Sequence, residues 1–233
     1  MRRLFPAILA VALSFGGCAG ATTPIVVELF TSEGCSSCPP ADEHLFELRR
    51  RDGILALGWH VDYWDWLGWR DRFADPEFSA RQRVYARRLG TPVYTPQLVV
   101  SGTHQAIGSA KWEVDAAIRQ ARSTGRRGVV ISASWRDEDL LEITLGEGAT
   151  GKTCLVHVVG FADEATSEVS AGENAGRTLR HANIVETWRT VGTWDGSPAV
   201  IIVPASSSSS NHAILVQMPG QGAIVGALEV STP

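Results

Sequence analysis

The chain has 233 residues, of which 44% are hydrophobic and 20% are charged, with a mean hydropathy of +0.00 and a formal net charge of −4. This composition is typical of a globular protein and excludes a disordered or collagen-like chain. The acidic balance and the short, scattered basic runs also exclude the clustered positive charge that a nucleic-acid-binding surface needs.

The N-terminus has the pattern of an export signal. Two arginines precede an apolar run from Leu4 to Phe15, and the small residues Ala19-Gly20-Ala21 follow. This order predicts a secretory signal peptide over residues 1–21, and the run is shorter than the roughly 20 apolar residues of a membrane span. We therefore expect a periplasmic or secreted protein. A second interpretation is lipidation at Cys18, which would be its one route to a membrane.

Strand-like and helix-like segments alternate over the first half of the chain. Strand–helix–strand units predict parallel pairing with right-handed crossovers, whereas two strands joined by the tight turn at Gly102-Thr103 should be antiparallel. An aromatic-rich segment, 62–73, looks irregular. The expected strands are 25–30, 54–61, 98–101 and 104–107, and the expected helices are 41–51, 76–89 and 109–123.

After residues 123–128 the pattern changes to strands separated by turns, with no helix. Seven such strands predict an antiparallel β-sandwich or barrel, so we expect an α/β domain over 22–124 and a β-rich domain over 125–233, with the boundary near Gly125. The serine run 206–210 is expected to be an exposed hairpin loop. The expected strands are 129–135, 140–145, 153–161, 178–190, 199–204, 213–218 and 223–230.

The segment VELFTSEGCSSCPPA places Cys35 and Cys38 between a strand and a helix. Such a pair can be a catalytic dithiol, half of a metal site or a structural disulfide. A helix N-terminus favours the reactive thiolate, so we expect an exposed attacking Cys35 and a shielded resolving Cys38. Pro39 and Pro40 are tolerated in the first helical turn, so the helix should begin near Cys38 or Pro39, which weakens the effect of its dipole on Cys35.

Four blocks of the sequence resemble a bacterial secreted family that is labelled a thioredoxin-like domain of unknown function. The resemblance covers nearly the whole mature chain and implies a thioredoxin fold over 22–124, followed by an extra domain, and thiol–disulfide oxidoreductase activity. It implies no substrate. The blocks are VELFTSEGCSSCPPA, HVDYWDWLGWRD, YTPQLVVSG and AGENAGRTLRH.

The resemblance also implies roles for individual residues. Cys35 matches the nucleophile, Cys38 matches the resolving thiol, and Thr95-Pro96 matches the cis-proline loop that pairs with an incoming peptide. Two positions depart from the thioredoxin pattern. Gly34 stands where an aromatic residue is common, and Glu28 lies seven residues before the first cysteine, where the buried proton-accepting acid usually lies six before it. Glu28 is therefore either that acceptor or an exposed strand acid.

Three further groups have both a structural and a functional interpretation. His60, Asp62 and Asp65 lie among tryptophans, which either pack over the core or form a peptide-binding wall beside the dithiol. Cys154 is expected to be a buried inert thiol by strand alternation, and a third redox cysteine or metal ligand is the alternative. A third, polar group is either surface polarity or a small-anion site or interdomain hydrogen-bond network near the dithiol; its members are Glu173, Asn174, Arg177, Arg180, His181 and Asn183.

Three functions remain after the sequence analysis. The first is an exported thiol–disulfide oxidoreductase that uses Cys35 and Cys38 on protein or small-molecule disulfides, with a redox partner and no cofactor or metal. The second is a copper-handling protein, in which His44 or His60 assists the cysteines. The third is a binding module with a structural disulfide. A structural zinc site needs four ligands, and no second CxxC exists.

Overall fold

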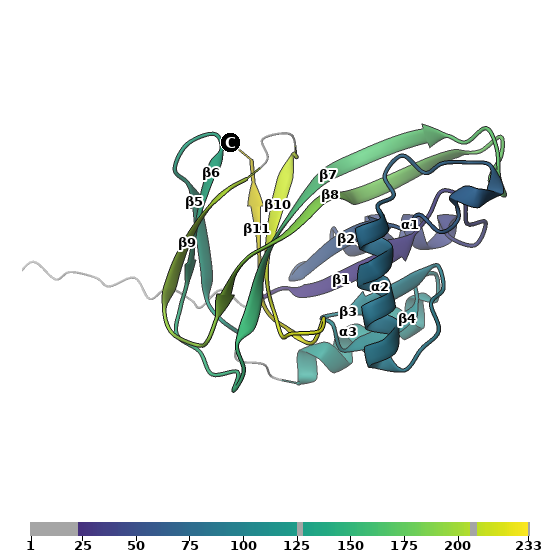
Figure 1. Cartoon of the computed structure of the whole chain (residues 1–233). Coiled ribbons are helices and arrows are strands. Elements are labelled where there is room, and N and C mark those ends of the chain that lie inside the picture. The colour runs from purple at the N-terminus through teal and green to yellow at the C-terminus, as the bar shows by residue number, and fades with distance from the viewer. Residues whose placement is uncertain (1–22, 125–127, 206–208, 233) are drawn as a thin grey trace, which may run out of the picture.

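A computed structural model describes residues 23–124, 128–205 and 209–232 of the chain (Figure 1). The expected signal peptide, Cys18, the domain boundary near Gly125 and part of the serine run lie outside these residues. The first half contains β1 (Ile25–Thr31), α1 (Pro39–Leu48), β2 (Ile54–His60), the 3-10 helix η1 (Asp65–Leu67), α2 (Pro76–Leu89), β3 (Gln97–Val100), β4 (His104–Ile107) and α3 (Lys111–Ser123). The second half contains β5 (Ile131–Trp135), β6 (Leu140–Leu145), β7 (Cys154–Glu168), β8 (Thr178–Trp194), β9 (Ala199–Pro204), β10 (Asn211–Gln217) and β11 (Ile224–Ser231).

The described strands form a large mixed sheet and a smaller antiparallel one. The large sheet has eight strands in the order β11-β10-β7-β8-β2-β1-β3-β4, and the small sheet has three in the order β5-β6-β9. Strands β1 and β2 are parallel, and β3 and β4 are antiparallel, as the connections predicted. The expected mixture of an α/β half and an all-β half is therefore confirmed at the level of its elements.

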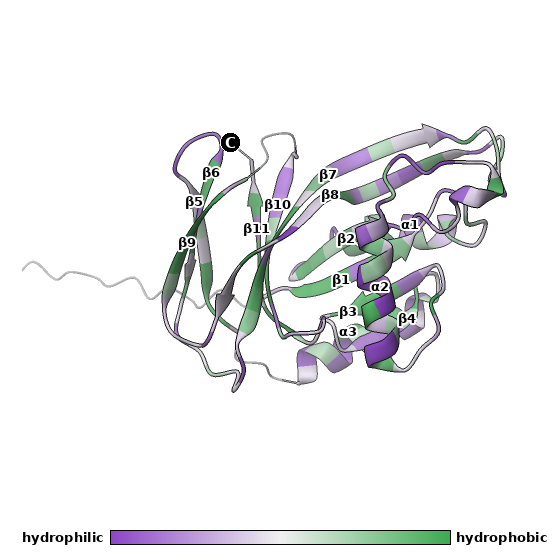
Figure 2. Ribbon diagram, viewed as in Figure 1, coloured by the Kyte–Doolittle hydropathy of each residue, from purple (hydrophilic) through white to green (hydrophobic). Residues whose placement is uncertain are grey.

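Helices cover both faces of the β2-β1-β3-β4 part of the large sheet. Alternation along β1 sends Val27 and Leu29 into one core with α1 and α3, and sends Val26 and Phe30 into a second core with Tyr85 of α2. Figure 2 shows the same division, with hydrophobic strands between helices that carry hydrophilic outer faces. Both faces of β1 are buried, which explains why its sequence reads as a nearly continuous apolar run.

The small sheet packs against the other end of the large sheet over a third core. Leu141 and Ile143 of β6 meet Val156 of β7 and Ile214 of β10 there. Cys154 is free and fully buried in this core, so the expectation of a buried thiol is confirmed. The two sheets therefore face each other across one hydrophobic layer, which accounts for the alternating pattern of the second half.

Strands β7 and β8 form a hairpin that is longer than the sequence predicted. They contain 15 and 17 residues and pair along most of their length, from Cys154↔Trp194 to Glu168↔Thr178. The extension of β7 runs through Ala162–Glu168, where half-exposed polar residues hide the strand pattern. In Figure 1 the hairpin reaches from the all-β end of the molecule across to the loops beside α1.

Gly58 allows this hairpin to join the sheet at β2. Residue 58 pairs with Ile184 of β8 in the parallel sense. A Cβ atom at this position would lie 3.0 Å from the carbonyl oxygen of Ala182 and 3.3 Å from Leu45 Cδ2, which is tighter than ordinary contact, so glycine suits this close approach of the two backbones. Beside it, the Asn183 amide donates a hydrogen bond to the Ala56 carbonyl at 2.8 Å.

A buried ion pair lies in the core between α2 and the sheet. Arg81 Nε donates to Glu28 Oε1 at 2.8 Å, and the hydroxyl of Tyr85 donates to Glu28 Oε2 at 2.5 Å. The guanidinium also donates to Gln217 Oε1 of β10 at 3.0 Å and stacks over the ring of Trp59. Arg81 therefore links α2, β1 and β10 through a carboxylate and an amide that are themselves fully buried.

Replacing this arginine should destabilise the fold strongly. We expect Arg81→Leu to lower the free energy of unfolding by about 3–5 kcal/mol, because it leaves the Glu28 carboxylate buried without its cation. Chemical denaturation measures the change. Arg83→Leu, on an exposed position of the same helix, is the matched control and should stay within about 0.5 kcal/mol of the wild type. Equal effects of the two substitutions would contradict the importance of the ion pair.

Candidate functional site

Cys35 and Cys38 form a disulfide in the turn between β1 and α1, with Cα atoms 5.4 Å apart. Cys38 is the N-cap of α1, which begins at Pro39, and its amide donates to the Cys35 carbonyl at 3.2 Å. Cys35 therefore precedes the first helical turn. The helix dipole acts mainly within that turn, so it favours a thiolate at Cys38 more than at Cys35.

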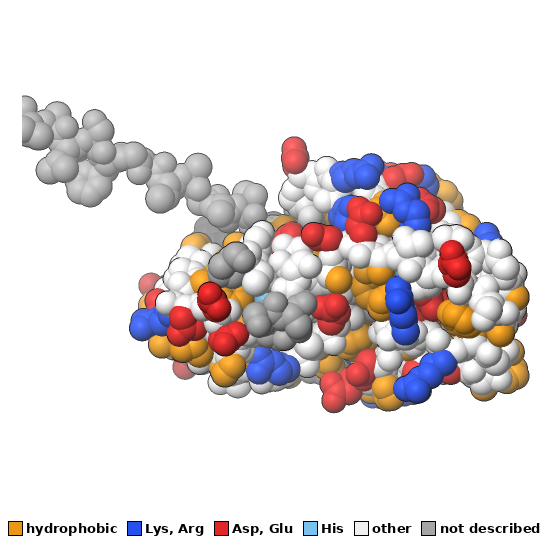
Figure 3. Space-filling view, turned by 90° about the horizontal axis from the view of Figure 1, so that it is seen from above, with side chains coloured by type: hydrophobic (Ala, Val, Ile, Leu, Met, Phe, Trp, Pro, Cys, Tyr) orange, Lys and Arg blue, Asp and Glu red, His pale blue; other side chains and the backbone are white. Residues whose placement is uncertain are grey.

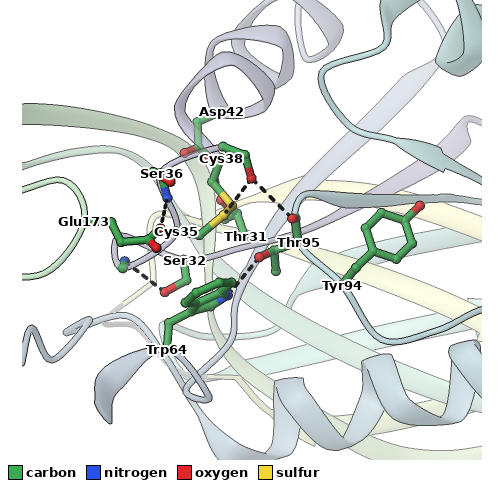
Figure 4. The surroundings of a disulfide bond; sticks show 12 residues. Thr31, Ser32, Cys35, Ser36, Cys38, Asp42, Trp64, Tyr94, Thr95 and Glu173 are labelled. Carbon is green, nitrogen blue, oxygen red and sulfur yellow. Dashed lines mark hydrogen bonds between the residues drawn. A yellow bond between two sulfur atoms is a disulfide. The ribbon is translucent and has the colours of Figure 1, made fainter. Parts of the chain in front are cut away.

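Both cysteines are buried, and the expectation of an exposed Cys35 is wrong. Cys35 is 1% exposed and Cys38 is 0% exposed, whereas Ser36 and Ser37 between them are exposed. The Ser37 hydroxyl lies 3.3 Å from Cys35 Sγ (Figure 4). The residues that shield Cys35 from solvent belong to segments distant in the sequence, so the local CxxC pattern could not reveal its burial.

The Thr95–Pro96 peptide bond is cis, as the resemblance implied, and it lies beside the disulfide. The Thr95 carbonyl accepts a hydrogen bond from the Ser37 hydroxyl at 3.5 Å, and Thr95 Oγ1 accepts one from the Trp64 indole at 2.8 Å (Figure 4). A Cβ atom at Gly34 would lie 2.9 Å from Trp64 Cβ. The glycine before the CxxC therefore leaves room for this tryptophan.

The aromatic segment both packs over the core and contacts the site. Tyr63 and Trp64 pack against the core beneath α2, and Trp69 Nε1 donates to Glu33 Oε2 at 2.7 Å. Two of its acids have local roles: Asp62 pairs with Ser79 of α2, and Asp65 accepts the amide of a residue later in the same loop. Both interpretations of this segment are thus partly right.

The turn of the β7–β8 hairpin docks onto the CxxC loop. Asn174 is fully buried, and its side-chain amide donates to the carbonyls of Glu33 and Cys35, each at 2.9 Å. The Glu173 carboxylate accepts the Ser36 amide at 3.0 Å (Figure 4). Two members of the polar group at 173–183 therefore form a hydrogen-bond network with the CxxC loop.

Five buried titratable residues lie together behind the disulfide loop, and we call them the acid–histidine cluster: Glu33, Asp42, His60, Asp71 and His181. His60 Nδ1 lies 2.7 Å from Asp71 Oδ2, which also accepts the Glu33 amide at 2.9 Å. His181 Nε2 lies 3.3 Å from Glu33 Oε1, and its Nδ1 lies 3.9 Å from Asp42 Oδ2. The rings of His60 and His181 meet edge to face, with centroids 4.7 Å apart.

The three carboxyl groups of the cluster have different pKa values because they have different partners. Burial raises the pKa of each. For Asp71, the charge and hydrogen bond of His60 outweigh burial and lower the pKa, and for Glu33 the contact with His181 does the same. For Asp42, burial prevails over the attraction of His181 and the hydrogen bond from Thr31, so its pKa rises to about 7.

Comparison with known proteins places the chain in a family. A family model described as a protein of unknown function, DUF1223, matches residues 26–217. The chain belongs to the DUF1223 family. This confirms the resemblance to a family of unknown function that the four sequence blocks indicated.

Two solved structures are similar to this DUF1223 chain. A structural genomics crystal structure of a protein from Agrobacterium tumefaciens is 35% identical, with a TM-score of 0.78, and the match covers 90% of this chain and 94% of that one. HBP35 of Porphyromonas gingivalis is 15% identical, with a TM-score of 0.65 over 90% of this chain and 75% of that one, and this likeness is one of fold. The search of curated proteins found no match.

Among the sequence-predicted site residues of the DUF1223 chain, four lie together and one lies apart. Cys35, Cys38, Thr95 and Pro96 meet at one end of the sheet, whereas Glu28 points to the opposite face from α1 and is held by Arg81. Glu28 is thus buried but not beside the dithiol, and the expectation of an exposed strand acid is wrong.

Asp42 is a buried acid near the disulfide that the sequence analysis did not single out (Figure 4). It follows Cys38 by one helical turn, and its amide donates to the Cys38 carbonyl at 3.1 Å. In ADEHLF it looks like an ordinary acid that favours a helix N-terminus. Its spacing of four from the second cysteine, which places both residues on one side of the helix, was the available signal.

No arrangement of three or more His, Cys, Asp and Glu residues suited to a metal ion occurs in the ranges that the structure covers. His44, a possible assistant in the copper interpretation, is buried with Nδ1 3.0 Å from the Gly108 carbonyl. His60 is engaged by Asp71. Of the helices described, none is long and apolar enough to cross a membrane.

Removing the Asn174 amide should loosen the disulfide loop. We expect Asn174→Ala to lower the free energy of unfolding by about 1–3 kcal/mol, because the buried Glu33 carbonyl loses its donor and the Cys35 carbonyl keeps only the Cys38 amide. Glu173→Ala is the control, since its exposed hydrogen bond to Ser36 should contribute little. Thermal or urea unfolding measures both. The docking would have no energetic importance if the two variants unfolded together with the wild type.

Asp42 should make the folded protein less stable as the pH rises. The folded state holds the Asp42 proton up to about pH 7, whereas a free aspartate releases it near 3.8. This stabilisation is fully present below about pH 4 and is lost as pH rises through 7. Between pH 5 and 8 the wild type should lose roughly 2–3 kcal/mol more than Asp42→Asn. Urea titrations of the two oxidised proteins at each pH measure the free energy of unfolding. If that free energy had the same pH dependence in both proteins, the prediction would be refuted.

Proposed function

We propose that this DUF1223 protein is an exported, thioredoxin-like thiol–disulfide oxidoreductase that acts on protein or small-molecule disulfides. The observation that carries the proposal is the Cys35–Cys38 disulfide at the N-terminus of α1, with the Thr95 backbone beside it. The strand order β2-β1-β3-β4, with α1 and α3 on one face and α2 on the other, supports the thioredoxin-like assignment.

The chemistry is a pair of sulfur exchanges. A substrate thiolate attacks Cys35 Sγ, which forms a mixed disulfide and breaks the Cys35–Cys38 bond, so Cys38 leaves as a thiolate and takes up a proton. A second substrate thiolate then attacks the substrate sulfur of the mixed disulfide and releases Cys35. The substrate loses two electrons and the protein gains them, and a redox partner reverses the sequence.

The surroundings of the disulfide suit a reaction in which the substrate bonds to Cys35 and Cys38 is the leaving thiolate. Cys38 is the N-cap of α1, whereas Cys35 is followed by the exposed Ser36 and Ser37. In Figure 4, Ser36 and Glu173 lie on one side of the disulfide and Thr95 lies on the other. An extended peptide can pair with backbone at such a position and bring its sulfur to Cys35. Because Cys35 is buried, the incoming sulfur must displace part of its cover.

One observation favours a second candidate, a binding module with a structural disulfide: both sulfur-bearing residues are buried. Structural disulfides resist reduction and have potentials below about −300 mV, whereas catalytic pairs lie above this value. The reduction potential of the Cys35–Cys38 pair therefore separates the two functions. Equilibration with glutathione or dithiothreitol buffers measures it directly.

Single cysteine variants test the exchange reaction. We expect Cys38→Ser to accumulate a mixed disulfide through Cys35 when it is incubated with a reduced protein substrate and an oxidant, because no resolving thiol remains. Cys35→Ser is the matched control and should trap nothing, since Cys38 is covered. Non-reducing electrophoresis and mass spectrometry identify the adducts. The oxidoreductase proposal fails if Cys38→Ser forms no adduct and the potential lies below about −300 mV.

A further inference from the structure

The turn between β7 and β8 is a compact unit, residues 169–177, that we call the hairpin tip. The Val169 amide donates to the Arg177 carbonyl at 2.9 Å, and the Gly176 amide donates to the Val169 carbonyl at 2.7 Å. Gly172 and Gly176 have φ of 74° and 80°, in the left-handed region that favours glycine. Because these bonds lie within the tip, it keeps its shape without help from the CxxC loop and can move as one piece.

The hairpin tip contacts the backbone of the CxxC loop on both sides of the Cys35 side chain. The Asn174 amide donates to the carbonyls of Glu33 and Cys35, each at 2.9 Å. The Glu173 carboxylate accepts the Ser36 amide at 3.0 Å (Figure 4). Cys35 is 1% exposed between these contacts. A sulfur that attacks the disulfide must first reach this side chain, so access depends on what covers it.

Two further contacts fix the orientation of the hairpin tip. The Arg177 guanidinium donates to Asn174 Oδ1 at 2.8 Å, so the NH2 group of this amide points to the loop carbonyls. A Cβ atom at Gly172 would lie 3.3 Å from Trp69 Cβ, so the tip rests directly on the aromatic segment. A larger side chain at residue 172 should therefore push the tip away from its docked position.

The hairpin tip is held by polar contacts and by no hydrophobic core. None of the three cores that the described residues form includes a residue of the tip. Within the tip, Val169 and Asn174 are buried, and the other residues are half-buried or exposed. Segments with few buried apolar contacts open locally at a lower free energy than the whole domain. Undocking of the tip should therefore cost less free energy than unfolding.

The part of the hairpin behind the tip has its own anchors. Arg49 of α1 donates to the Asp163 carbonyl at 2.8 Å and pairs with Glu164. Arg72 of the aromatic segment donates to the Thr166 carbonyl at 3.0 Å. Figure 3 shows acidic and basic side chains interspersed over the face that it draws, in agreement with such pairing. These anchors hold the strands in place, so only the tip needs to move.

The opposite side of the disulfide is held more firmly. Thr95 lies on that side in Figure 4, and its Oγ1 accepts the Trp64 indole at 2.8 Å. Trp64 packs against the core beneath α2, and a Cβ atom at Gly34 would lie 2.9 Å from its Cβ. Because this side rests on a core and the hairpin tip does not, the tip is the part that opens.

We propose that the hairpin tip is a movable cover of the disulfide: Cys35 Sγ becomes open to attack when the tip leaves the CxxC loop, and Asn174 is the positioning residue that keeps it docked. A role of this cover in regulating exchange rests on the proposed oxidoreductase function, whereas the covering itself applies to any thiol reagent.

Dithiothreitol is a suitable reagent. One of its thiolates attacks Cys35 Sγ, the Cys35–Cys38 bond breaks, and Cys38 leaves as a thiolate that takes up a proton. The second thiolate of the reagent then closes a ring and releases Cys35. The reagent loses two electrons and the protein gains them.

The rate at which dithiothreitol reduces the native, oxidised protein measures the opening. Alkylation of Cys35 and Cys38 with iodoacetamide, followed by mass spectrometry, counts the reduced molecules. We expect Asn174→Ala to be reduced about tenfold faster or more, because loss of this buried donor favours the undocked tip. Ile143→Val, in the core between the two sheets, is the matched control, since it lowers global stability without touching the tip. It should be reduced at the wild-type rate, and equal acceleration of both variants would overturn the proposal.

Two further variants make the test independent of one substitution. Gly172→Val places a side chain against Trp69 and should also accelerate reduction. Trp64→Phe, on the other side of the disulfide, should accelerate it less. Acceleration by Trp64→Phe alone would assign the opening to that side and contradict the proposal. Wild-type rates in folded Asn174→Ala and Gly172→Val would contradict it as well.

Hydrogen exchange of the Ser36 amide reports undocking without any sulfur chemistry. This amide loses its acceptor, Glu173, when the tip leaves. In Asn174→Ala it should exchange faster by the same factor as the reduction rate, while amides in the centre of β1 stay unchanged. Both accelerations without trapping by Cys38→Ser would refute the oxidoreductase function and support the cover. Trapping by Cys38→Ser without these accelerations would refute the cover alone.

Discussion

The close approach of β8 to β2 at Gly58 is the contact on which the arrangement of this molecule depends. It joins strands from both halves of the chain into one sheet, and the glycine leaves room for the β8 backbone, whose Ala182 carbonyl oxygen would lie 3.0 Å from a Cβ at residue 58. From that point β8 runs toward the disulfide and brings His181 to Glu33 and Asp42. The hairpin turn that precedes β8 brings Asn174 to the Cys35 carbonyl.

The elements themselves were largely predictable from the sequence, because hydrophobic period and turn residues are local signals. The helix over Pro76–Leu89 was predicted to the residue, with a proline in its first turn and Gly90 at its C-cap in the left-handed region. The β7–β8 hairpin was underestimated because its outer part, beyond Phe161, is only partly buried and rests on α1 and the CxxC loop instead of on a core. Strand extensions stabilised by distant loops have no local periodicity.

Of the candidate site, only the cysteine pair and the cis-proline bond were predictable from the sequence. The pair Cys35 and Cys38 and the Thr95–Pro96 bond follow from spacing and resemblance, but the cover over Cys35 depends on a turn about 140 residues further along the chain. The positions of Glu28 and Asp42 also depend on segments distant in the sequence. Alternation along β1 turns Glu28 toward Arg81 on α2, and Asp42 at the start of α1 is buried beside His181 of β8.

The position of β8 also bears on how the chain can be divided. All seven residues of β2 are buried, and β8 covers the edge that β1 leaves open. A fragment that ends after α3 would present this edge as an unpaired, hydrophobic row of backbone groups, which is a template for strand addition between molecules. The C-terminal half therefore protects the N-terminal half from self-association, and the Cys35–Cys38 pair studied on the isolated half would be studied in an aggregation-prone protein.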